Sequence, residues 1–148
     1  MRTPPIYWVV FFRAQKQTYF MKEVATMSHI VQIQTEVRSE AAVQAACKRL
    51  QLPPAKRGTF ELYNSIETGL GIELPDWRYL VVANTENGQL VFDNYEGRWG
   101  KQECLDQFLQ RYTVEAATIA ARKQGHIVTE RALEDGSIKL TVSVGGNV

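Results

Sequence analysis

The sequence contains few residues that could cross-link a fold covalently or through a metal. Of its 148 residues, two are cysteine and two are histidine. Cys47 and Cys104 lie far apart along the chain, as do His29 and His126, so neither pair has the spacing of a zinc or haem site. The sequence therefore predicts two free thiols, no metal site and no cofactor. Such cysteine usage is typical of a reducing compartment, and the expected location is cytoplasmic.

An excess of charge and a long apolar run are also absent. Seventeen Lys and Arg residues face sixteen Asp and Glu residues, and this balance argues against a partner bound mainly through its phosphates. The basic residues are scattered along the chain, so there is no strong nucleic-acid signal. Residues 6–12 form an apolar run that is too short to cross a bilayer, and Arg13 follows it instead of the small residues of a secretory cleavage site. No transmembrane segment is predicted.

The remaining composition is that of one folded domain. Hydrophobic residues make up 45% of the chain and charged residues 22%, which excludes a disordered tail or an acidic linker. Residues 27–148 have regular patterning throughout. They are predicted to form a single α+β domain.

Residues 1–26 differ from the rest in charge and in aromatic content. They carry a net charge of +3 and six of the fifteen aromatic residues. Three interpretations are open: an extension upstream of a true start at Met27, an ordered extra strand or amphipathic helix, and a membrane-surface anchor. The change in composition favours the N-terminal extension. On that interpretation, a chain that begins at Met27 folds and melts within a few degrees of the full-length protein.

Hydrophobic periodicity predicts two helices and seven strands in residues 27–148. Ser39 stands as the N-cap of the first helix, which ends before Pro53, and the second helix covers residues 101–124 with Gly125 as its stop. The longer helix is expected to bury one face, formed by Leu105, Phe108, Leu109, Tyr112, Ala116, Ile119 and Ala120. The strands are expected at residues 30–38, 59–63, 70–74, 77–83, 89–95, 126–133 and 138–144. This order, βαββββαββ, favours an α+β fold with one antiparallel or mixed sheet of about seven strands and both helices packed on one face.

Two polar and aromatic segments are the candidate binding site. The loop before the second helix concentrates aromatic, amide and charged side chains near a helix N-terminus, where anions are favoured. Asp93 and Asn94 are also suited to closing a turn there, and Trp99 to plugging the end of the core. A second segment carries Arg78, which could stack on an aromatic ring or pair with a carboxylate. The candidate residues are Trp77, Arg78, Tyr79, Asp93, Asn94, Tyr95, Arg98, Trp99 and Lys101.

Substitutions would separate folding from recognition at these positions. If Trp99 plugs the core, Trp99→Ala destabilises the fold by about 3–5 kcal/mol. Arg98→Ala and Arg78→Ala are expected to change stability by about half a kcal/mol at most, because a loop arginine ordinarily reaches water. Both are expected to weaken the binding of a partner or an anion.

Several of these segments together resemble a known family. They are Met27-Ser28-His29-Ile30, Trp77-Arg78-Tyr79, Asp93-Asn94-Tyr95-x-Gly97-x-Trp99-Gly100 and Asp135-Gly136-Ser137-Ile138-Lys139-Leu140. Over about residues 27–145 the chain resembles the domain of unknown function 1257 family, which includes the hypothetical chloroplast reading frame 35. The resemblance implies a domain that begins at Met27 and acts as an accessory subunit. It supplies no activity, cofactor or catalytic residue.

Two functions from different classes fit the sequence. The first is a non-catalytic module that binds a protein partner, because Trp, Tyr and Arg dominate interface energetics. The alternative is a small enzyme or ligand-binding protein, in which Arg78, Arg98 and Lys101 hold an anionic small molecule and Asp93 or Glu96 acts as acid or base. The alternative requires a pocket of about 300–1,000 Å³ lined by these side chains.

Overall fold

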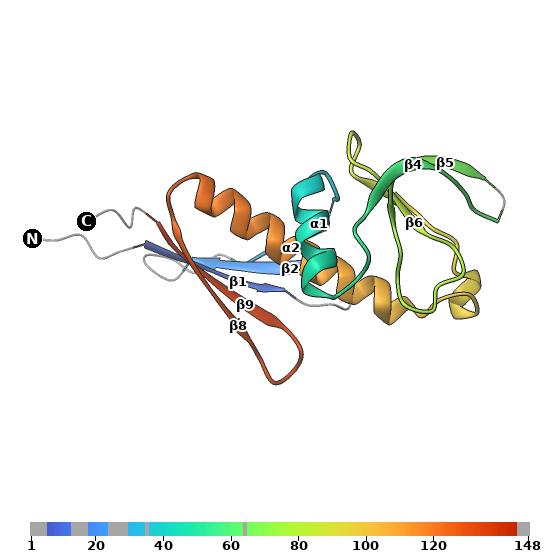
Figure 1. Ribbon diagram of the computed structural model, residues 1–148. Helices are drawn as coiled ribbons and strands as arrows, with labels where there is room; N and C mark the ends of the chain where they lie inside the picture. Colours follow the sequence, from blue (N-terminus) through green and yellow to red (C-terminus); the bar gives the residue numbers. More distant parts are fainter. Residues whose placement is uncertain (1–5, 13–17, 24–29, 35, 64, 145–148) are drawn as a thin grey trace, which may run out of the picture.

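The chain folds into two antiparallel sheets with two α-helices between them (Figure 1). The computed structural model describes residues 6–12, 18–23, 30–34, 36–63 and 65–144. Its helices are α1 (Glu40–Arg49) and α2 (Gln102–Lys123), with a short 3₁₀ turn, η2 (Tyr95–Gly97). The strands are β1 (Ile6–Phe12), β2 (Thr18–Glu23), β3 (Ile30–Gln34), β4 (Lys56–Glu61), β5 (Ile66–Ile72), β6 (Val81–Asn84), β7 (Gln89–Val91), β8 (Ile127–Ala132) and β9 (Ile138–Val144).

The α+β class is confirmed, but the expectation of one seven-stranded sheet is wrong. Strands β4, β5, β6 and β7 pair in sequence order as a separate four-stranded sheet. The other sheet has the order β3-β2-β1-β9-β8 and contains five strands. The strands between the two helices are joined by short connections, so each pairs with its neighbour in the chain rather than with the strands outside the helices.

The segment 1–26 contributes two strands to the five-stranded sheet. β1 lies between β2 and β9, and its pairing with β9 runs from Ile6 opposite Val144 to Phe12 opposite Ile138. This matches the interpretation of residues 1–26 as ordered strand, with two strands in place of one. Met27, the expected start of the domain, lies outside the described residues, and the sheet has strands on both sides of it.

Helix α1 begins, and helix α2 ends, where the local chemistry predicts. The Ser39 hydroxyl accepts a hydrogen bond from the Ala42 N–H at 3.1 Å and so caps the first turn of α1. After α2, Gly125 takes a φ of +80°, which glycine adopts without the steric cost that a side chain brings. These two signals are local, which is why the sequence alone was sufficient to place them.

The strands predicted at residues 77–83 and 89–95 are among those that are shorter than expected, and this creates the loops that carry the candidate site. Residues 77–80 precede β6, because Asp76 at φ +59° turns the chain before Trp77. Similarly, β7 ends at Val91, and residues 92–101 form a loop that includes η2. The two loops run side by side, since the Arg78 N–H donates to the Trp99 carbonyl at 2.8 Å.

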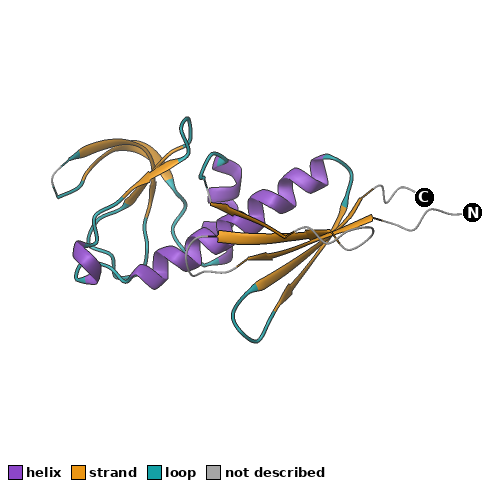
Figure 2. Ribbon diagram, turned by 180° about the vertical axis from the view of Figure 1, so that it is seen from behind, coloured by secondary structure: helices purple, strands orange, loops and turns teal. Residues whose placement is uncertain are grey.

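Helix α2 contributes residues to both buried clusters of the molecule. In its first half, Leu105, Phe108 and Leu109 pack with α1 and with strands β5 and β6 in the main core. Further along, Val114 packs against Ile138 and Leu140 of β9 in a second buried cluster. Figure 2 shows the result from behind: the two sheets lie at opposite ends of the molecule and the helices lie between them.

A buried tyrosine ties the start of α1 to α2. The Tyr112 hydroxyl accepts hydrogen bonds from the backbone N–H groups of Arg38 at 2.9 Å and Ser39 at 3.1 Å. Tyr112→Phe keeps the ring but leaves both N–H groups without this acceptor, so we expect the free energy of unfolding to fall by about 1–3 kcal/mol. Urea denaturation measures this loss. Tyr79→Phe is the matched control, because the structure gives the Tyr79 hydroxyl no hydrogen-bond partner within its described ranges, and an equal loss in both variants would contradict the assignment.

Candidate functional site: an aromatic and arginine cluster

The indole of Trp99 gathers aromatic rings from three separate segments at one end of the molecule. Its ring centroid lies 4.8 Å from that of Tyr95, 5.0 Å from that of Tyr63 and 5.6 Å from that of Tyr79. Tyr95 is stacked on Trp99, whereas Tyr79 meets it edge-on. We call these four rings, together with the guanidinium groups of Arg78 and Arg98, the Trp99 cluster.

Each guanidinium group of the cluster lies over an aromatic ring. The Arg78 Cζ is 4.9 Å from the Trp99 centroid and 5.6 Å from the Tyr79 centroid, and the Arg98 Cζ is 5.1 Å from the Tyr95 centroid. Both arginines are exposed, and neither forms an ion pair with any residue that the structure describes. Arg78 therefore stacks on rings, and the carboxylates of Asp93 and Glu96 do not neutralise it.

The loop holds Tyr95 and Trp99 together through its backbone. Asp93 Oδ1 accepts from the Tyr95 N–H at 3.1 Å, and the Asn94 carbonyl accepts from the N–H groups of Gly97 at 3.0 Å and Trp99 at 2.9 Å. Three consecutive residues, Tyr95, Glu96 and Gly97, have φ values of +47°, +53° and +96°. This left-handed backbone is uncommon for residues with side chains, and tyrosine tolerates it only where the surroundings hold it. Asp93 and Asn94 thus close the turn, as one of the two interpretations predicts.

Trp77, and not Trp99, closes the end of the main core. The Trp77 ring packs against the core cluster and lies so close to Gly100 that a Cβ there would clash with the ring. The Trp77 Nε1–H donates to the Lys101 carbonyl at 3.1 Å, and Phe92 meets the ring edge-on at 5.9 Å. The expectation that Trp99 plugs the core is therefore wrong. The loop carries Trp99 past the core end, which Trp77 already fills.

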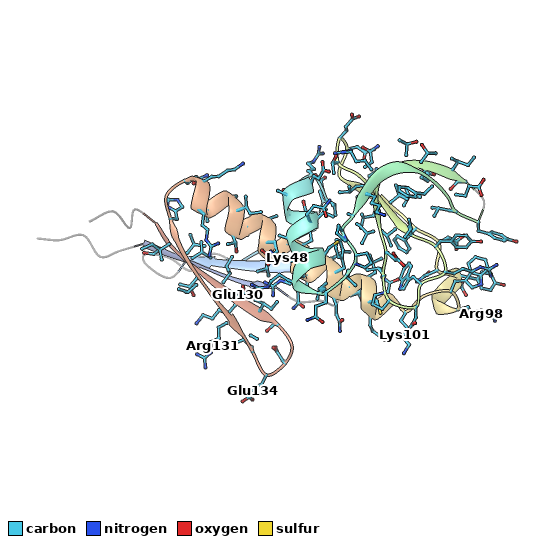
Figure 3. The ribbon with its side chains drawn as sticks, in the orientation of Figure 1. Lys48, Arg98, Lys101, Glu130, Arg131 and Glu134 are labelled. Carbon is cyan, nitrogen blue, oxygen red and sulfur yellow. The ribbon has the colours of Figure 1, made fainter. Side chains whose placement is uncertain are left out.

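The remaining candidates lie at the start of α2, beside the cluster. The Asn94 side chain donates to Gln102 Oε1 at 3.3 Å. Lys101 is exposed and immediately precedes α2, and Figure 3 shows its side chain and that of Arg98 at the end of the molecule away from Arg131 and Glu134. Of the nine predicted residues, the structure thus brings five into the Trp99 cluster, namely Arg78, Tyr79, Tyr95, Arg98 and Trp99.

Two residues that the sequence analysis missed complete this surface. Tyr63, which is 60% exposed, and Ile66, which is 66% exposed, flank the turn between β4 and β5. The turn is closed by the Leu62 N–H, which donates to the Ser65 carbonyl at 2.8 Å. Beside it is an open hollow of about 490 Å³, lined by Glu61, Leu62, Tyr63, Ser65 and Ile66. Arg78, Arg98 and Lys101 do not line this hollow, although Tyr63 connects it to Trp99.

The cysteines and the potential metal ligands of the described residues do not gather into a shared site. Within these residues, no three His, Cys, Asp or Glu side chains gather as a metal ion would require. Cys47 and Cys104 are free thiols, as predicted, and burial raises the pKa of the Cys47 thiol above its ordinary value. Neither α1 nor α2 has the length and the apolar character that a bilayer-crossing helix needs.

Comparison with known proteins identifies no relative of this chain. No family model matches the sequence, and no curated protein and no solved structure matches it either. The resemblance to the domain of unknown function 1257 family stays a prediction. The case for function consequently depends on the geometry of the Trp99 cluster.

Proposed function

We propose that the protein is a non-catalytic accessory domain that binds a protein partner through the Trp99 cluster. The observation that carries this proposal is the contact of the half-buried Trp99 with three tyrosine rings and a guanidinium. Two of these rings and the guanidinium are exposed. Tyr95 remains 51% exposed in spite of its stacking on Trp99. Tryptophan, tyrosine and arginine are the residue types most enriched at interface hot spots. Two free thiols are compatible with a partner in the cytoplasm.

Two further features support a binding surface over an enzyme site. The cationic residues that would hold an anionic substrate lie outside the hollow beside the cluster, whereas small-molecule sites surround their ligand on several sides. Asp93, one candidate acid or base, is engaged by the Tyr95 N–H as part of the turn. The left-handed backbone at Tyr95 and Glu96 is a cost to folding, and such costs concentrate at active sites and at ligand-binding sites alike. It marks the loop as functional under either alternative.

Site-specific cross-linking in native cells tests the proposal. A photoreactive phenylalanine analogue at Tyr95 is expected to capture one defined protein, while the same analogue at Glu134, an exposed residue at the other end of the molecule, does not (Figure 3). The captured protein, once purified, should bind the wild-type chain and lose most of that binding to Tyr95→Ala. A small anionic ligand that co-purifies in the absence of any cross-linked protein would instead support the ligand-binding alternative.

A further inference from the structure

The two guanidinium groups of the Trp99 cluster have unused hydrogen-bonding capacity. Each guanidinium carries five N–H donors in a planar fork that matches a carboxylate. Elsewhere in the described chain, Arg38, Arg49, Arg57 and Arg111 pair with glutamates, whereas Arg122 and Arg131 form no ion pair there. Arg78 and Arg98 have no such pair, and their contacts with rings leave the donor edges available. Stacking also restricts the side chains, so less conformational entropy is lost when an anion binds.

The same surface has an apolar part and an acidic part. Tyr63 and Ile66 each expose more than half of their surface, and these two side chains suit an apolar side chain of a partner. Glu61 also lines the hollow, and Glu96 is exposed between Tyr95 and Arg98 along the loop. A nucleic acid carries a negative phosphate at every nucleotide, so some of its phosphates would lie near these carboxylates and be repelled by them. A peptide can place its carboxylates at the arginines alone.

We propose that the Trp99 cluster and the adjoining hollow bind an acidic segment of a partner protein. Carboxylates of this segment pair with Arg78 and Arg98, and one of its apolar side chains lies against Tyr63 and Ile66. This inference rests on the proposed function and names the chemistry of the partner. Charge-assisted bonds from a planar guanidinium to a carboxylate supply the orientation, and the aromatic contacts supply the apolar area.

Selection from a library of random peptides displayed on phage tests the proposal directly. The full-length protein is the bait, and the double variant Arg78→Gln/Arg98→Gln removes phage that bind elsewhere. Peptides that bind the full-length protein but not the double variant are expected to be rich in Asp and Glu. They are also expected to contain a recurring aliphatic or aromatic residue. Enrichment of basic or uncharged peptides, or no enrichment at all, would overturn the acidic-segment proposal.

Affinity measurements on an enriched peptide, made by fluorescence anisotropy, then assign the contacts. Arg78→Gln and Arg98→Gln should each weaken binding at least about fivefold, as expected for hot-spot residues. Arg131→Gln is the matched control, because Arg131 is exposed on β8 at the other end of the molecule (Figure 3), and it should leave affinity within about twofold. Ile66→Ala should weaken binding, whereas Ile127→Ala, at a residue that is 57% exposed on β8, should not.

Competition separates a peptide from a nucleic acid or a free anion. Single-stranded oligothymidylate and inorganic phosphate should displace the labelled peptide only weakly at physiological salt. Tighter binding of oligothymidylate than of any selected peptide would refute the acidic segment and indicate a single-stranded nucleic-acid surface. If Tyr95 cross-links a protein whose binding is unchanged in Arg78→Gln and Arg98→Gln, the proposed function stands and the acidic-segment inference fails.

Discussion

Replacement of Trp77 by alanine is expected to destabilise the fold by about 3–5 kcal/mol, the usual cost of removing a packed aromatic side chain. The indole fills the space above Gly100 and packs against the main core, and its Nε1–H satisfies the Lys101 carbonyl next to the first turn of α2. Its loss leaves a cavity and removes that hydrogen bond at once. Urea denaturation, followed by circular dichroism, measures the change in the free energy of unfolding.

The comparison with Trp99→Ala makes this expectation specific. Trp99 contacts mainly other rings of the surface cluster, and such aromatic pairs contribute about 0.5–1.5 kcal/mol each beyond the area that they bury. We expect Trp99→Ala to cost less than half of what Trp77→Ala costs, while it abolishes partner binding. Equal destabilisation by the two variants would show that Trp99 is a core residue after all.

The elements predicted well are those whose signals are local in sequence. Ser39 caps α1 and Gly125 ends α2 through bonds and dihedral angles within a few residues. The buried face of α2 was only partly foreseen. Leu105, Phe108, Leu109 and Tyr112 are buried as expected, but Val114 is buried as well. Ala116 and Ile119 stay against the main core, whereas Val114 packs on β9, so α2 buries a second face. A single apolar stripe assumes one packing partner, and α2 has two.

The division into two sheets could not be predicted, because strand pairing is decided by segments that are distant in the chain. Nothing in residues 6–12 marks them as the neighbours of residues 138–144, yet β1 and β9 pair along their entire length. The candidate site was limited in the same way. The loops at residues 77–79 and 93–101 were recognised from their composition, but Tyr63 reaches Trp99 only through the folding of the β4–β5 hairpin.

A chain that begins at Met27 is expected to fold cooperatively, because β3 can occupy the place of β1 beside β9. All neighbours in the five-stranded sheet are antiparallel, so β3 runs in the same direction as β1. Without β1 and β2, strands β3 and β9 each lose a neighbouring strand, and each is left with an unpaired edge. The two strands are then free to pair in the antiparallel sense, which would give a smaller sheet with the order β3-β9-β8.

The existing register favours this exchange. Phe12 is paired with both Ile138 and Tyr19, and Tyr19 is paired with Ile33, so Ile33 and Ile138 already lie in one row across the sheet. By the same reasoning Val31 lies in the row of Leu140, through Val10 and Met21. A shift of β3 by two strand positions, roughly 10 Å, would therefore pair apolar residues without any change of register. A one-residue slip of β3, which would move its side chains to the opposite face of the sheet, is not required.

Thermal melting and nuclear magnetic resonance together decide whether the exchange occurs. The truncated chain should melt in one cooperative transition, and its spectra should contain backbone proton contacts between Val31 and Leu140 and between Ile33 and Ile138. The full-length chain is the control, because two strands separate these residues there and the contacts should be absent. Loss of cooperative melting would show that β1 and β2 are indispensable to the sheet. Cooperative melting without the new contacts would show that the four-stranded sheet and the helices fold independently of β3, since the main core draws on residues from Val37 onward.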